Sequence, residues 1–164
     1  NKDYFRTKIG NMITKNDIIR RIRFIFDFND SKMIELFALG GQTVTRAEIS
    51  DWLKKDDNPD FVKITDNQLA IFLNGLIVNN RGKKDGVELV AEERLNNNMI
   101  FRKLRIGLNL KDEEILSIIE LAGMKISKHE LSAFFRNPNQ PQYRPCNDQI
   151  LRNFLHGLQL KHKK

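Results

Sequence analysis

The residues of this chain that most often perform catalysis or hold metals are few. Its three histidines, His129, His156 and His162, all lie in the C-terminal third of the 164 residues. A metal site on one helix needs ligands three or four residues apart. His129 and Glu130 are adjacent and therefore point to different faces of a helix. We expect no metal site and no histidine-based catalysis.

Cys146 is the single cysteine, which excludes an internal disulfide. It directly precedes Asn147, where we expect a helix to begin, and a helix N-terminus could lower the pKa of a thiol and make it reactive. The alternative, which we favour, is a buried apolar role packing toward Leu151. The sequence also has no glycine-rich phosphate loop. We therefore predict no catalytic residue and no cofactor, and so a protein that is not an enzyme.

Basic side chains are the stronger functional signal. Residues 1–94 hold 16 basic and 15 acidic side chains, whereas residues 95–164 hold 12 and 6. Such an excess favours an anionic partner, above all nucleic acid, because phosphate contacts give affinity that does not depend on sequence. The candidate phosphate contacts are Arg20, Arg21, Arg23, Arg102, Lys103, Arg105, Lys125, Lys128, Arg136, Lys161, Lys163 and Lys164.

Two readings of these cations stay open. Arg20, Arg23 and Asp27 are expected on one face of a helix, and the arginines could instead pair with Asp30 or Asp66. A helix-turn-helix could also be drawn through KISKHELSAFFR, which would place Lys125, Lys128, His129 and Arg136 near phosphates. That pattern is weak, because Ile119 and His129 stand where the motif usually has a small residue and a branched apolar residue.

The elements that carry these residues come from an internal duplication. Shifting the chain by 82 residues aligns 14–78 with 96–160 without a gap, and 16 of the 65 positions are identical. Apolar residues recur at helical spacing in both copies, and nothing alternates as a strand would. The sequence therefore predicts an all-α protein of two tandem repeats, each of about four short helices.

Helix-start signals divide each repeat. We expect helices over about 15–27 and 31–39, the second capped by Asp30 in the first copy and Asp112 in the second, and ending at Gly40 or Gly123. The third helix begins at a capping box, Thr45 with Glu48 or Ser127 with Glu130. The fourth begins at Thr65 or Asn147.

Domain limits follow from these signals. Residues 1–11 precede Met12 and are interpreted as a tag remnant or N-terminal extension, with a native arm as the alternative. Residues 12–80 form helical repeat 1, residues 81–94 a charged linker, and residues 95–164 helical repeat 2. No apolar run approaches the length of a membrane helix, so we expect no membrane contact and a cytoplasmic location.

Four segments carry a resemblance to a known family. They are NDIIRRIRFIFDFNDSKMIELFAL, DNQLAIFLNGLIVNNRGKK, RLNNNMIFRKLRIGLNLKDEEIL and SKHELSAFFRNPNQPQYRPCNDQILRNFLHGLQL. Together they make residues 12–164 resemble the YehS-like family, a bacterial family of unknown function. The resemblance implies a bacterial, cytoplasmic protein that begins at Met12, and it implies no activity.

The leading functional prediction is therefore a nucleic-acid-binding or nucleic-acid-associated module that uses the duplicated basic helix face. The rival is a protein-interaction adaptor that receives a helix or tail between the two repeats. A small-molecule pocket between the repeats is a third reading.

Overall fold

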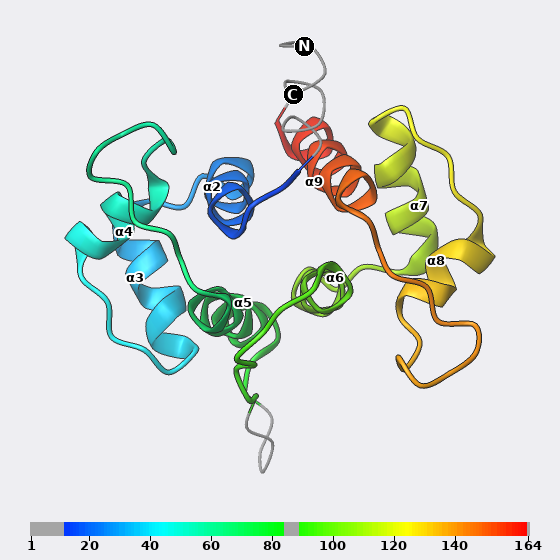
Figure 1. Cartoon of the computed structure of the whole chain (residues 1–164), viewed down its shortest axis with the longest axis horizontal. Coiled ribbons are helices and arrows are strands. Elements are labelled where there is room, and N and C mark those ends of the chain that lie inside the picture. Colours follow the sequence, from blue (N-terminus) through cyan, green and yellow to red (C-terminus); the bar gives the residue numbers. More distant parts are fainter. Residues whose placement is uncertain (1–11, 84–88, 164) are drawn as a thin grey trace. The chain divides into compact units, whose positions relative to one another are not determined.

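The computed structural model describes residues 12–83 and 89–163, and within these ranges the chain is helical with no strand. Its helices are α2 (Lys15–Phe26), α3 (Asp30–Leu39), α4 (Arg46–Leu53), α5 (Asp66–Arg81), α6 (Asn97–Gly107), α7 (Asp112–Leu121), α8 (Lys128–Phe134) and α9 (Asp148–His162) (Figure 1). The all-α prediction and the four helices per repeat are confirmed. The interpretation of residues 1–11 falls outside the described residues.

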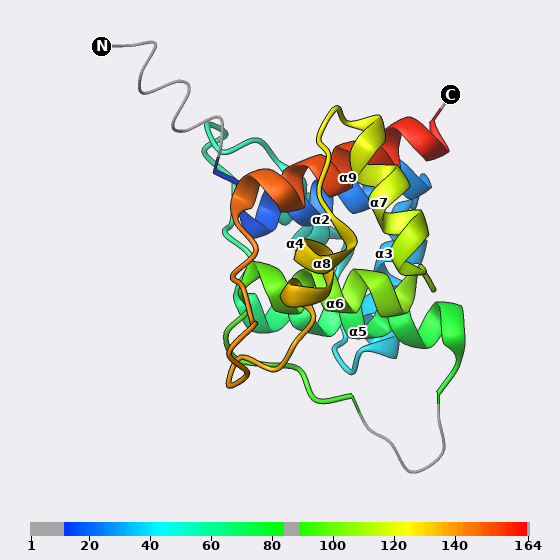
Figure 2. The same ribbon diagram turned by 90° about the vertical axis from the view of Figure 1, so that its right-hand side faces the viewer.

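The helices gather into two compact units that do not coincide with the two sequence repeats. Residues 15–109 form one unit, which contains α2 to α6. Residues 110–163 form the other with the segment 12–14, and it contains α7, α8 and α9. The first helix of the second repeat, α6, therefore belongs to the unit built mainly from the first repeat. Figure 2 shows α6 running beside α5.

The core of the unit 15–109 is aromatic and aliphatic. Phe37 of α3 lies with its ring 5.2 Å from the ring of Trp52 on α4 and 5.2 Å from the ring of Phe72 on α5. The apolar stripe of α2, including Ile18 and Ile22, is fully buried. The helical spacing of these residues in the sequence therefore marks their burial correctly.

Side-chain caps begin most helices. The capping boxes predicted at Thr45 with Glu48 and at Ser127 with Glu130 are both present, with their backbone N–H groups bonded to side-chain oxygens at 3.0–3.1 Å. The prediction that Asp30 and Asp112 cap the second helices is wrong by one residue. Asn29 occupies the N-cap position before α3 and Lys111 the one before α7, so both aspartates sit in the first helical turn. There they still complement the helix dipole.

The first helix of each repeat is followed closely by a residue in the left-handed conformation. Asp27 has φ +53° and Asn109 has φ +52°, and these two positions are 82 residues apart. Aspartate and asparagine tolerate this conformation better than other side chains with a Cβ. Asp27 therefore lies just after the end of α2. The prediction that Asp27 shares a helix face with Arg20 and Arg23 is wrong for this reason.

Two duplicated glycines let neighbouring helices approach at the backbone. A Cβ built on Gly75 of α5 would lie 1.7 Å from the Leu36 carbonyl oxygen of α3. A Cβ on Gly157 of α9 would lie 1.9 Å from the Ile118 carbonyl oxygen of α7. The four residues occupy matching places in the repeats, so the same close packing recurs in both units.

A matched pair of aspartates ties each unit to the segment that leads into a repeat. Asp66, at the start of α5, accepts a hydrogen bond from the Leu95 backbone N–H at 2.8 Å. Asp148, at the start of α9, accepts one from the Ile13 backbone N–H at 3.2 Å. Leu95 and Ile13 are themselves 82 residues apart. Each aspartate of one repeat therefore holds the opening segment of the other repeat.

The segment between the repeats is partly bound. The Asn67 side-chain amide of α5 donates to the carbonyl oxygens of Ala91 and Glu92, both at 3.2 Å. Leu89 and Val90, just before them, are exposed. The C-terminal part of the predicted linker is thus attached to α5 rather than fully solvated.

Candidate nucleic-acid interface

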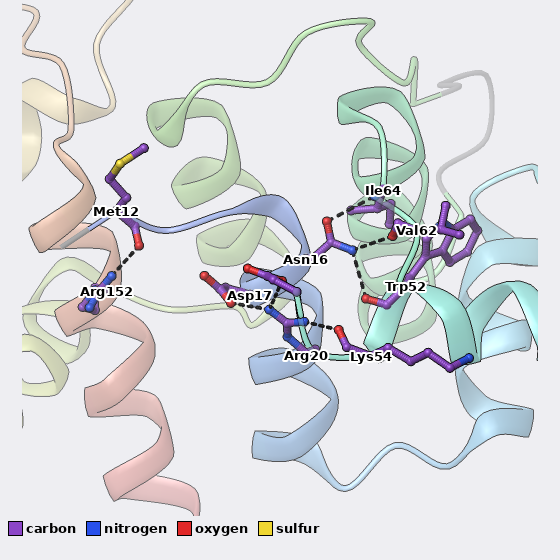
Figure 3. Close-up of polar contacts among 10 residues, drawn as sticks. Met12, Asn16, Asp17, Arg20, Trp52, Lys54, Val62, Ile64 and Arg152 are labelled. Carbon is purple, nitrogen blue, oxygen red and sulfur yellow. Dashed lines mark hydrogen bonds and ion pairs between the residues drawn. The ribbon is translucent and has the colours of Figure 1, made fainter. Parts of the chain in front are cut away.

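The two duplicated arginines of α2 bind within their own unit. Arg20 donates to the Lys54 carbonyl oxygen and to Asp17 Oδ1 (Figure 3). It also lies 3.3 Å from Asp56 Oδ1. Arg23 donates through Nε to the Phe28 carbonyl oxygen at 3.0 Å, and its Nη2 lies 3.0 Å from Asp30 Oδ1. The pairing of Arg23 with Asp30, left open from the sequence, is therefore present. These two arginines hold the ends of helices together.

Lys103 is the most buried of the candidate cations that the structure describes, with only 9% of its surface exposed. Its ammonium donates to Asn74 Oδ1 at 2.6 Å and lies 2.9 Å from Glu92 Oε1. A phosphate cannot reach this nitrogen without displacing both partners. Lys103 is therefore a structural residue of the unit 15–109 in this conformation.

The other candidates on α2 and α6 differ in exposure. Arg102 is exposed, whereas Arg21 and Arg105 are half-buried. Arg102 and Arg20 occupy matching positions of α6 and α2. Arg102 is exposed to solvent, whereas Arg20 binds a carbonyl oxygen of its own unit.

The segment considered as a helix-turn-helix, which includes KISKHELSAFFR, has a short second helix. Helix α8 has seven residues, and its buried side chains, Leu131, Ala133 and Phe134, occupy its second half. At 1.5 Å per residue it is only about 10 Å long. Its exposed start includes Glu130, whose carboxylate accepts from the Ser127 backbone N–H. A helix of this length with an acidic first turn offers little surface to a DNA groove.

Cations flank that segment on its solvent side. Lys125 is exposed in the connection before α8 and has no carboxylate partner among the residues that the structure describes. Lys128 pairs with Glu113 at 3.1 Å in full exposure, and this contact raises the pKa of the Lys128 ammonium. Arg136 is half-buried just after α8. An exposed ion pair is screened by salt and is easily exchanged for another anion.

The C-terminal lysines are spread along the end of α9. Lys161 is exposed and lies with Glu113 and Glu114 around a shallow depression next to α7. Lys163 caps the end of α9 and is half-buried. Lys164 lies outside the described residues. The acidic first turn of α7 therefore reduces the positive potential close to Lys161.

The sulfur and imidazole groups show no catalytic arrangement within the described ranges. Cys146 is 5% exposed, and burial together with the nearby Asp148 carboxylate raises the pKa of its thiol to about 12. The reactive alternative for this thiol is thus contradicted. His129, His156 and His162 are all exposed, and the partial desolvation of the His162 ring together with the Lys161 charge lowers the pKa of that imidazole. No group of three metal-binding side chains forms in the part of the chain that the structure describes.

One buried polar residue organises the first repeat and was not singled out from the sequence. Asn16 is 1% exposed, and its Nδ2 donates to the carbonyl oxygens of Trp52 at 2.9 Å and Val62 at 3.0 Å (Figure 3). Its Oδ1 accepts from the Ile64 backbone N–H at 3.2 Å. The signal in the sequence is its identity with Asn98, which is also buried, at the same place in the second repeat.

The described residues thus define a class of small, internally duplicated all-helical proteins. A family model described as "Protein of unknown function (DUF1456)" matches it twice, over residues 15–82 and 97–164. The chain belongs to this family, and the two matches confirm the tandem duplication.

Comparison with curated proteins agrees with the family. The chain is 40% identical over 144 residues to the "Uncharacterized protein YehS" of Escherichia coli (strain K12), covering 87% of this chain and 92% of that protein. The YehS-like resemblance seen in the sequence is therefore confirmed. No solved structure matches the chain. Within the described ranges, no helix is long and apolar enough to cross a membrane.

Proposed function

We propose that this chain is a non-catalytic module that binds the sugar-phosphate backbone of nucleic acid through exposed cations of its second repeat. The observation that carries the proposal is the charge of residues 95–164, with 12 basic against 6 acidic side chains. Diffuse phosphate contacts need positive charge at the surface and no shaped groove.

The contact set is narrower than the sequence suggested. Arg20, Arg23 and Lys103 are excluded because their donors are bound inside the fold. Arg102 in the unit 15–109 and Lys125 in the other unit are the central contacts, since both side chains are exposed. The other candidates in the second repeat are Arg105, Lys128, Arg136, Lys161, Lys163 and Lys164, and Arg21 of the first repeat is a candidate beside them.

The arrangement of acidic groups supports the same proposal. Three of the six carboxylates in the second repeat accept hydrogen bonds from backbone N–H groups, namely Glu114 from Lys111, Glu130 from Ser127 and Asp148 from Ile13. These carboxylates are held at helix starts, where the helix dipole complements their charge. We infer non-specific or shape-dependent binding, because the short α8 supplies no base-reading helix.

A charge-matched pair of variants tests the proposal. Arg102→Glu with Lys125→Glu should weaken the binding of labelled duplex DNA, single-stranded DNA and RNA alike, and should lower the slope of log affinity against log salt by about 2 on duplex DNA. The control, Lys55→Glu with Lys63→Glu, changes the net charge equally at exposed lysines of the first repeat. Equal losses in both double variants would show that only net charge matters, and unchanged binding by the first variant would refute the assigned contacts.

The second candidate function is a protein-interaction adaptor. The exposed leucines Leu121 of α7 and Leu160 of α9 favour it, since 53% and 42% of their surfaces remain accessible. Such a contact would be insensitive to salt, in contrast to phosphate binding. Leu121→Lys would then abolish partner capture without changing nucleic-acid affinity. A cytoplasmic location is compatible with either function and stays a prediction.

A further inference from the structure

The unit 15–109 contains a pocket of about 600 Å³ between α3, α5 and α6. Its walls are largely apolar and include Leu39, Ile77, Val78 and Ile106. Leu39 and Ile106 are exposed to solvent although they are large aliphatic side chains. A volume in the range of about 300–1,000 Å³ with apolar walls is typical of small-molecule sites.

Asn74, in the middle of α5, lines this pocket although it is only 1% exposed. Its Nδ2 is buried and finds no acceptor among the residues that the structure describes. A buried N–H donor without an acceptor is costly, and such groups in native proteins call for an explanation. An acceptor atom brought by a ligand would satisfy it once the neighbouring side chains shift, because the nitrogen itself is covered in the unliganded chain.

The orientation of the Asn74 amide is fixed by Lys103. The Lys103 ammonium donates to Asn74 Oδ1 at 2.6 Å, and an ammonium has no acceptor to offer Nδ2. The amide must therefore keep its oxygen toward Lys103 and its nitrogen away from it. Glu92, 2.9 Å from the same ammonium, balances that charge. The Asn74 amide nitrogen is thus oriented as a hydrogen-bond donor, and the neighbouring Lys103–Glu92 ion pair carries no net charge.

The two repeats do not share the polar residues of this pocket. The position of Asn74 is taken in the second repeat by His156, which is exposed, and that of Lys103 is taken in the first repeat by Arg21. Glu92 lies in the segment between the repeats. A constellation present once in a duplicated chain is specific to this pocket.

Among the described residues that line the pocket, the charged side chains are positive. Arg81 and Lys83 line it, and no carboxylate lies among its described lining residues. Arg81 reaches the Ile106 carbonyl oxygen at 3.4 Å and Asn109 Oδ1 at 3.3 Å, and both atoms are engaged by Nη1. Its other guanidinium nitrogens remain able to attract an anion.

We propose that this pocket binds a small carboxylic acid with an extended apolar chain. One carboxylate oxygen accepts a hydrogen bond from Asn74 Nδ2, the cations Arg81 and Lys83 attract the acid, and the chain lies against Leu39 and Ile106. A helix of a partner protein would not supply the acceptor that Asn74 Nδ2 lacks, because the carbonyl groups of a helix are already bonded within it. The site is independent of the nucleic-acid contacts proposed above.

Isothermal titration of the full chain with three ligands of one chain length tests the head group. We expect decanoate to bind, 1-decanol to bind about tenfold more weakly, and decylamine to show no heat of binding, with the two ionic ligands below their micelle concentrations and 1-decanol below its aqueous solubility. Binding of decylamine as tight as that of decanoate, or no binding by any of the three, would overturn the proposal.

Two variants test the location. Asn74→Asp keeps the acceptor for Lys103 and replaces the free donor with a carboxylate oxygen, so it should abolish decanoate binding. Ile106→Trp fills the pocket from its exposed wall and should do the same even if the first variant folds poorly. Leu121→Trp is the control, because Leu121 is equally large and exposed but belongs to the other unit. Retained decanoate binding by Ile106→Trp would contradict the assignment of the ligand to this pocket.

Discussion

Replacing Gly75 by alanine should separate two helices that touch at the backbone. The new Cβ would lie 1.7 Å from the Leu36 carbonyl oxygen and 2.7 Å from the carbonyl carbon, whereas ordinary contact begins near 3.4 Å. Both obstacles are backbone atoms of α3, so no side-chain rotation can relieve the overlap. Helix α3 must move away from α5 by more than 1 Å, which loosens the packing of Phe37 against Phe72.

The expected loss follows from two opposing effects. Overpacking a well-packed core costs about 1–3 kcal/mol and occasionally more, and the severe overlap here places Gly75→Ala at or above the upper end. Alanine regains about 1 kcal/mol through its better helix propensity. We therefore expect the free energy of unfolding to fall by about 2 kcal/mol or more. Urea unfolding followed by circular dichroism at 222 nm measures this change.

Gly107→Ala is the matched control, because it is also a helical glycine of the same unit. Its Cβ would meet the Ile77 Cγ1 atom at 3.3 Å, and this side chain can shift. We expect a change within about 1 kcal/mol, because the small overlap with Ile77 opposes the gain in helix propensity. Wild-type stability in Gly75→Ala, or equal losses in both variants, would refute the close-packing explanation for the duplicated glycine.

Further predictions concern single polar or ionisable residues. Asn16→Ala should lower the free energy of unfolding by about 2–4 kcal/mol, measured by urea titration, because three backbone groups lose their buried partner; a loss below 0.5 kcal/mol would contradict this role. Lys103→Met should cost about 1–3 kcal/mol in the same assay, since Glu92 and Asn74 lose the ammonium they share, and a stabilised variant would argue against the pairing. Cys146 should resist Ellman's reagent at pH 8 until the protein unfolds. Because folding raises its pKa to about 12, the folded state keeps a proton that the unfolded state loses, so stability should decline as pH rises from about 9 to 12. Rapid labelling of the native thiol would contradict its burial.

Local sequence signals predicted much of the secondary structure. The capping boxes at Thr45 and Ser127 depend on residues three apart, so they are readable without tertiary information. The cap before α3 was misplaced because Asn29 and Asp30 are both good capping residues, and only the backbone conformation distinguishes them. The repeat alignment located the buried apolar positions because both copies must bury the same faces.

The hydrogen-bond partners of the basic side chains could not be predicted in the same way. Arg20 binds a carbonyl oxygen 34 residues away, and Lys103 binds an asparagine 29 residues away. Such partners are set by how the helices pack, which helical spacing does not specify. A small-molecule pocket between the repeats was a third reading of the sequence, but Asn74 and the other lining residues could not be named, since α6 joins the unit of the preceding repeat. The identity of Asn16 with Asn98 was available and indicates a buried polar role in retrospect.

The salt dependence of nucleic-acid binding tests the central claim most directly. Fluorescence anisotropy of labelled duplex DNA, single-stranded DNA and RNA, titrated with the full chain between about 50 and 200 mM salt, measures it. If exposed cations contact phosphates, affinity should fall steeply and linearly on logarithmic axes, with a slope of about −0.9 per contact for duplex DNA. Absence of binding at the lowest salt, or affinity that does not change with salt, would contradict the proposed function.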